Sequence, residues 1–145
     1  MKKILSLLFA ATLIMGLAMA TDTAITAVNT LTGENSYVTF TARASWQAVP
    51  TSTNTAYLAY SGAYRYYVMV NSTSVGTTPT FNVLAGDNPP SFRSGIGNLA
   101  VSLTVNQCRL IGPLESARFV NSTGYLKIST TNVTTGTMVV IKVAR

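Results

Sequence analysis

Few side chains in this sequence are suited to covalent catalysis or metal binding. The 145 residues include no histidine, the commonest general base and metal ligand in proteins. Cys108 is the single cysteine, so this chain alone cannot build a zinc or iron–sulfur site. Of the four carboxylates, we interpret Asp87 and Glu115 as turn residues. The sequence therefore predicts no enzyme activity, no catalytic residue, no metal site and no cofactor.

The residues best suited to recognition are aromatic. A run of tyrosines between positions 57 and 67 contains one arginine, and a tryptophan lies upstream. In a strand, Tyr64 and Tyr66 share one face while Arg65 and Tyr67 share the other, so one row is core and the other is available for contact. Tyrosine is enriched at contact surfaces, although it also simply suits sheets. The candidate contact surface is Trp46, Tyr57, Tyr60, Tyr64, Arg65, Tyr66 and Tyr67.

A second candidate contact site lies between residues 85 and 97. Asp87-Asn88-Pro89-Pro90 cannot donate regularly to a strand ladder, and two glycines follow shortly after. We expect a long ordered loop here. Its candidate contact residues are Asp87, Asn88, Phe92 and Arg93.

Two kinds of covalent modification are also possible. Asn71, Asn121 and Asn132 begin N-glycosylation acceptor patterns, and each is expected at a turn, although a mature chain of this composition gives about 2.6 matches by chance. Cys108 either forms a disulfide with another chain or is buried as a small hydrophobic residue.

The N-terminus has the pattern of a secretory signal peptide. Lys2 and Lys3 precede an apolar run from Ile4 to Met15, and Ala18-Met19-Ala20 resembles a cleavage site. We predict a signal peptide at 1–20 and one domain at 21–145, secreted or on the cell surface, with no stable membrane span after cleavage. The alternative, an uncleaved anchor, also places the domain outside the membrane.

The charge of the predicted domain argues against a nucleic-acid partner. Without Lys2 and Lys3, the net charge of the chain falls from +6 to +4. The remaining basic residues are scattered singly, with no block that could follow a phosphate backbone.

The elements that must position these residues are strands. The body is rich in Thr, Ser, Val and Tyr and poor in the residues that fill helices. We predict an all-β fold: a single antiparallel β-sandwich, jelly-roll or Ig-like, of about nine strands. The predicted strands are Thr23–Val28, Ser36–Ala42, Ala56–Tyr60, Tyr64–Val70, Thr80–Ala85, Leu99–Val105, Ala117–Val120, Tyr125–Ser129 and Met138–Val143.

Two details of this fold follow from the pattern. Leu99, Val101, Leu103 and Val105 alternate with small or polar residues, so we expect all four to face the core. The last three predicted strands are separated by glycine-containing turns, and we expect them to pair in succession as a meander.

Three segments carry a resemblance to a known class of protein. They are Gly86–Arg93, Leu110–Phe119 and the turn Gly124-Tyr125-Leu126. Over about the last 60 residues, the chain resembles small all-β structural proteins of tailed viruses and prophages, although the N-terminal leader departs from that class. The resemblance implies a compact sandwich that decorates or assembles into a larger protein surface.

Together these features predict an exported, non-enzymatic structural or cell-surface protein that acts through protein contact. Its partners would be further copies of itself, as in a sheath, lattice or filament, or other cell-envelope proteins. The alternative is a secreted carbohydrate- or ligand-binding module, in which Trp46 and exposed tyrosines stack on the sugar rings of a glycan.

Overall fold

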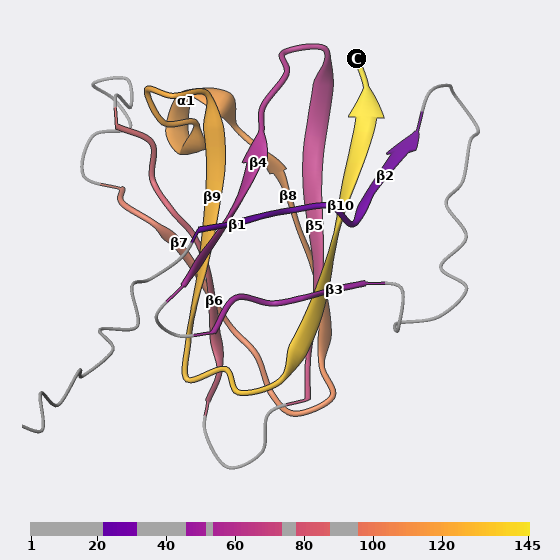
Figure 1. Ribbon diagram of the computed structural model, residues 1–145, viewed down its shortest axis with the longest axis vertical. Coiled ribbons are helices and arrows are strands. Elements are labelled where there is room, and N and C mark those ends of the chain that lie inside the picture. The colour runs from indigo at the N-terminus through magenta and orange to yellow at the C-terminus, as the bar shows by residue number, and fades with distance from the viewer. Residues whose placement is uncertain (1–21, 32–45, 52–53, 74–77, 88–95) are drawn as a thin grey trace, which may run out of the picture.

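The computed structural model describes residues 22–31, 46–51, 54–73, 78–87 and 96–145 (Figure 1). The predicted leader at 1–20 and the predicted strand Ser36–Ala42 lie outside these residues. Within them the chain is mostly β-strand, so the all-β prediction is confirmed. The elements are β1 (Thr23–Ala24), β2 (Val28–Leu31), β3 (Gln47–Ala48), β4 (Thr55–Ala59), β5 (Tyr64–Ser72), β6 (Thr80–Val83), β7 (Leu99–Ser102), β8 (Cys108–Leu114), α1 (Ser116–Phe119), β9 (Tyr125–Thr131) and β10 (Gly136–Ala144).

The strands form two mixed sheets. In the first, which we call sheet A, the order is β1-β4-β9-β6-β7. In the second, sheet B, the order is β2-β10-β5-β8, and β3 also pairs with β10. The expectation of purely antiparallel neighbours is wrong, because β1 runs parallel to β4 and β2 runs parallel to β10. Both parallel strands come from the N-terminal segment, which no short hairpin joins to its neighbours.

The core lies between the two sheets. Phe81 and Ile128 of sheet A and Val68, Met138 and Val140 of sheet B all belong to one hydrophobic cluster, and each is at most 1% exposed. Figure 1 looks between the sheets, with β4, β6 and β9 on one side and β5, β8 and β10 on the other. Burial of side chains of this size stabilises a fold by about 1.5–3 kcal/mol each before entropy is subtracted.

The N-terminal segment belongs to both sheets. It contributes β1 to sheet A and, only a few residues later, β2 to sheet B. The Gln47 side chain holds the crossing: its Oε1 accepts a hydrogen bond from the Thr26 amide (2.7 Å) and its Nε2 donates to the Ala24 carbonyl (2.9 Å). The predicted strand Thr23–Val28 is therefore two strands joined by a change of sheet.

The predicted C-terminal meander is wrong in two respects. The segment predicted as strand Ala117–Val120 is mostly the short helix α1, because the Glu115 carbonyl accepts bonds from the Arg118 amide (3.2 Å) and the Phe119 amide (3.1 Å). Only Val120 keeps a strand contact, an isolated bridge to Leu126. In addition, β9 and β10 do not pair, since β9 lies in sheet A and β10 in sheet B.

The strand predicted at Leu99–Val105 is shorter than expected. β7 ends at Ser102, and although Leu103 is 1% exposed as predicted, Val105 is 42% exposed. The chain turns between them: the Gln107 amide donates to the Thr104 carbonyl (3.1 Å) and Asn106 has a φ of 61°. Val105 therefore lies on this turn and does not face the core.

Candidate functional site

The predicted contact surface does not form one surface. Tyr66 is 1% exposed, and its hydroxyl accepts a hydrogen bond from the Ser61 amide (2.8 Å). Burial raises the pKa of this hydroxyl above its ordinary value. The Tyr60 ring lies 5.1 Å from the Tyr66 ring and the Tyr64 ring lies 6.5 Å from it, so the three form an aromatic cluster at one end of the core. Tyr66 is a core residue, and its assignment to a contact surface is wrong.

The other tyrosine row lies on the face of sheet B that points away from sheet A. Arg65 is exposed there and Tyr67 is half-buried. Trp46 is only 8% exposed, yet it is not part of the cluster between the sheets. Extending the pairing of β3 with β10 by one residue places Trp46 opposite Val139, on the same outer face. Trp46 is too buried to serve as an exposed stacking platform.

Of the candidate contact residues in the predicted loop, only Asp87 is described, since Asn88, Phe92 and Arg93 lie outside the described residues. Asp87 is exposed, and its carboxylate accepts bonds from the Ser122 amide (2.8 Å) and hydroxyl (2.7 Å). The hydroxyl bond is the main reason that the pKa of Asp87 lies below its ordinary value. The Gly86 amide also donates to the Arg118 carbonyl (2.7 Å), so this end of the loop is fixed to the turn after α1.

The three glycosylation candidates differ in accessibility. Asn71 is 2% exposed within β5, so its expected position at a turn is wrong and the folded chain hides its amide. The side-chain Oδ1 of Asn121 accepts bonds from the Thr123 amide, the Thr123 hydroxyl and the Tyr125 amide. Asn132 is exposed at a turn with a φ of 57°. Glycosylation at Asn121 and Asn132 stays a prediction.

The most exposed large apolar side chains are not among the contact residues that the sequence predicted. Ile96, Val105 and Leu110 are 44%, 42% and 58% exposed, and among the described residues these are the exposed large hydrophobic side chains. All three fall within residues 96–110, which include β7 and the start of β8. Cys108, at the first position of β8, is also exposed, so the alternative of a buried cysteine is wrong.

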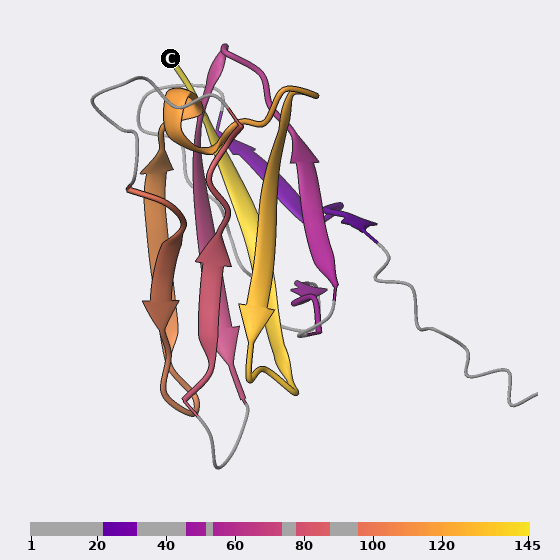
Figure 2. The same cartoon turned by 90° about the vertical axis from the view of Figure 1, so that its left-hand side faces the viewer.

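These residues occupy one side of the molecule. β7 is the last strand of sheet A and β8 the last strand of sheet B, and the short segment 103–107 joins them. Figure 2 shows both strands, in orange, at the same edge of the two layers. Within the described part of the chain β8 pairs with β5 alone, and we call its other side the open edge of β8. An exposed edge with apolar side chains is a template for pairing with another strand.

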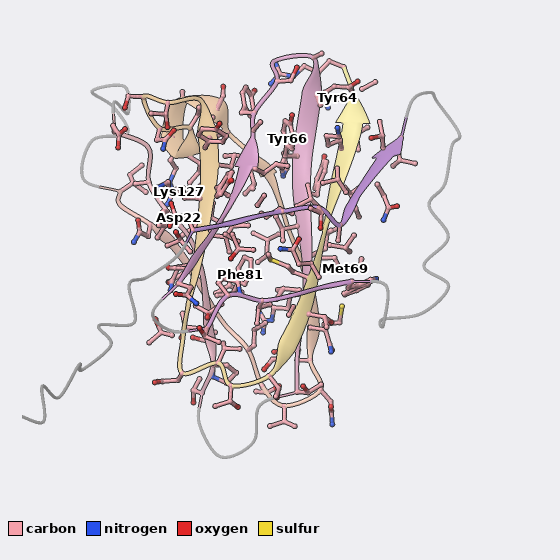
Figure 3. The ribbon with its side chains drawn as sticks, in the orientation of Figure 1. Asp22, Tyr64, Tyr66, Met69, Phe81 and Lys127 are labelled. Atoms are coloured by element: carbon pink, nitrogen blue, oxygen red, sulfur yellow. The ribbon has the colours of Figure 1, made fainter. Side chains whose placement is uncertain are left out.

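A second site lies on the opposite sheet. Asp22, Tyr57, Thr123, Tyr125 and Lys127 line a shallow pocket of about 300 Å³ on the outer face of sheet A. The Lys127 ammonium lies 2.8 Å from the Asp22 carboxylate. Figure 3 labels the two residues next to each other. This bond is the main reason that the pKa of Asp22 lies below its ordinary value, and a hydrogen bond from the Thr55 hydroxyl acts in the same direction. The rings of Tyr57 and Tyr125 meet edge to face, 5.2 Å apart.

In the ranges that the structure describes, no three His, Cys, Asp or Glu side chains gather where they could hold a metal ion. In the same ranges, no helix is long and apolar enough to cross a bilayer.

No protein-family model, curated protein or solved structure matches this chain. The likeness of its last third to viral structural proteins therefore stays a prediction. Any functional proposal must be based on the geometry of the chain itself, namely the open edge of β8 and the pocket on sheet A.

Proposed function

We propose that the protein is an exported, non-enzymatic structural or cell-surface protein that acts through protein–protein contact at the β7–β8 side of a single Ig-like or jelly-roll β-sandwich. The observation that carries the proposal is the exposure of Leu110 on β8, the last strand of its sheet, with Val105 and Ile96 exposed in the segments that flank β7. The location outside the cytoplasm rests on the leader pattern at residues 1–20.

The two edges of sheet B differ in how they are protected. On one side the sheet ends in two short strands that both pair with β10, β2 along Val140–Val143 and β3 at Thr137 and Met138, and short edge strands limit further pairing. On the other side of the sheet, β8 carries the exposed Leu110. Soluble proteins usually protect an edge with lysine, proline or a covering segment. Pro113 gives the far end of β8 such protection, but the start of the strand has an apolar side chain instead.

The experiment measures assembly. The chain would be expressed in full and purified as the cell processes it, and its mass would be followed by light scattering across a concentration series. We expect assemblies larger than a monomer, and we expect Leu110→Lys to shift them towards monomer by placing a charge on the edge. Ala59→Lys is the matched control, because Ala59 is exposed at the end of β4 in the other sheet. A strict monomer at every concentration would contradict the proposal.

A second candidate function is the binding of a neutral saccharide in the pocket on sheet A. Tyrosine rings suit the apolar faces of sugar rings, and Asp22 and Lys127 supply an acceptor and a donor whose charges balance. The buried Trp46 has no part in this site. An array of neutral glycans would test it: Tyr125→Ala should abolish binding and Tyr67→Ala, on the other sheet, should not. Equal binding by both variants would exclude this pocket.

A further inference from the structure

We propose that two copies of this chain pair edge to edge through β8, antiparallel and about a two-fold axis, with Leu110 opposite Leu110 of the second copy. The proposal rests on the proposed contact function and names its partner and its register. Four features of β8 lead to it: the direction of its backbone groups, the registers that symmetry allows, the row of side chains that ends at Leu110, and the position of Arg109.

The backbone of β8 presents hydrogen-bonding groups to solvent at alternate residues. The Ser72 amide donates to the Gln107 carbonyl (3.2 Å), so this carbonyl faces β5. Because this direction alternates along an antiparallel ladder, the groups of Arg109 and Ile111 also face β5, and those of Cys108 and Leu110 face the open edge. Pro113 has no amide hydrogen to donate, so the part of the edge able to pair ends before it.

Symmetry restricts the register of such a pair. Residues directly opposite each other in an antiparallel pair point to the same face. A two-fold axis between two identical strands must therefore place one residue directly opposite its own copy. With the axis at Leu110, the backbone groups of the two Leu110 residues, which face the open edge, bond to each other. The ladder then extends from Cys108 to Gly112 in both copies. An axis at Cys108 would place Asn106 opposite Leu110, but the Asn106 amide already donates to the Ser72 carbonyl (2.7 Å), so that ladder ends at Gln107. The axis at Leu110 therefore allows the longer ladder.

The side chains favour the same register. On the outer face of sheet B, Val139 lies opposite Met69 and Met69 lies opposite Leu110. Figure 3 shows Met69 on the side of β5 away from the core residue Phe81. Along this row Val139 is 2% exposed, Met69 is half-buried and Leu110 is 58% exposed. A second copy paired at Leu110 would continue the row across the axis with its own Leu110, Met69 and Val139.

The positive charge of Arg109 favours one register over another. With the axis at Leu110, Arg109 lies opposite Ile111 of the second copy. With the axis at Arg109, two guanidinium groups would lie directly opposite each other, which is unfavourable. β7 is a poorer place for such pairing, since its exposed side chains, Ala100 and Ser102, are small. β8 is thus complementary to itself in one register.

Disulfide cross-linking tests the register directly. With the axis at Leu110, the two Leu110 Cα atoms would lie about 5.5 Å apart, within the range that a disulfide bridges. The two native Cys108 residues would be offset by four residues, or about 14 Å along the strands, which is too far. The double variant Cys108→Ser, Leu110→Cys should therefore form a covalent dimer when diamide oxidises the paired thiols. The natural chain and the control variant Cys108→Ser, Ala59→Cys should not exceed random cross-linking.

The alternative outcomes are distinguishable. Cross-linking through native Cys108, without cross-linking at position 110, would overturn the register and leave the contact function standing. If neither position cross-links while Leu110→Lys still dissociates the assembly, the edge of one copy contacts a different surface of the next copy, and two-fold pairing through β8 is excluded. A monomer in all measurements would overturn both proposals.

Discussion

β9 and β10 follow each other in the sequence but differ in their pattern of burial. In β9, Leu126, Ile128 and Thr130 are buried and the residues between them are half-buried, as in a sheet with one solvated face. In β10, the four consecutive residues Met138–Ile141 are all buried. Since neighbours along a strand point to opposite faces, sheet B is covered on both sides at β10 and sheet A only on its inner side.

The outer faces differ accordingly. Around β9, the outer face of sheet A has Thr55, Ser129 and Asn82 in register with one another, along with the Asp22–Lys127 ion pair. Around β10, the outer face of sheet B has Val139 beside Met69 and Ile141 beside Tyr67. The comparison indicates that sheet A faces solvent or a polar ligand, whereas sheet B has a second apolar layer that extends to its open edge.

The largest expected effect is that of a charge placed in the apolar layer. Val139→Asp would bury an uncompensated carboxylate, and we expect a loss of about 3–5 kcal/mol of unfolding free energy. Ser129→Asp, at the corresponding outer position of β9, should change it by about 0.5 kcal/mol or less. Urea unfolding followed by circular dichroism measures both. Equal losses would show that the two outer faces do not differ.

Truncation of isoleucines compares the outer layer with the core. Ile141 lies on the outer face and is 9% exposed, whereas Ile128 lies between the sheets and is 1% exposed. We expect each change to alanine to cost about 2–5 kcal/mol, with Ile128 the more costly. A loss below about 1 kcal/mol for Ile141→Ala, measured by the same unfolding method, would mean that the outer layer contributes little to stability.

The link between the sheets is the next test. Gln47→Ala removes the side-chain bonds to the Thr26 amide and the Ala24 carbonyl, where the N-terminal segment passes from sheet A to sheet B, and each such bond is worth about 0.5–1.5 kcal/mol. Hydrogen exchange should show faster opening of β1 and β2. Gln107→Ala is the matched control, because the Gln107 side chain bonds only locally, to the Thr104 amide (3.0 Å). Slow exchange of β1 and β2 in Gln47→Ala would contradict this role.

The smallest effect concerns the ion pair on the polar face. Because the folded pKa of Asp22 is depressed, its contribution to stability is present above the unfolded pKa of about 3.9 and is lost as the pH falls through the folded value. The side chains of Lys127 and Asp22 are 36% and 42% exposed, so we expect less than about 1 kcal/mol. Asp22→Asn should flatten the pH dependence of unfolding below pH 4 slightly, and salt should reduce the effect. An unchanged pH dependence would show that the ion pair contributes nothing to the free energy of unfolding.

Local pattern was sufficient to find most strands. The segments predicted around β4, β5, β6, β9 and β10 are strands within a few residues of the expected limits, because alternating Thr, Val and Tyr between turn residues is a local signal. The strand β8 was missed, since Gly112 and Pro113 lie within it and both are uncommon in strands.

The partner of each strand and the exposure of each side chain could not be predicted from local pattern. The spacing of β9 and β10 in the sequence is typical of a hairpin, but the partner of each strand depends on distant strands. The unbroken apolar run of β10 was the one local sign of a strand covered on both faces. The tyrosine rows were separated correctly into two faces, yet which row is core depended on the position of sheet A. Leu110 became a candidate only once β8 was seen to end its sheet.

The position of β10 has a consequence for how the chain reaches its native state. Its residues follow all the other described strands in the sequence, yet they lie between β5 and β2, and Val140 pairs with Val28 more than a hundred positions earlier. Sheet B cannot close until β10 has been synthesised, and contacts between such distant residues form slowly. We therefore expect sheet B to stay open in the nascent chain until β10 has been made, a state that would suit the export proposed above.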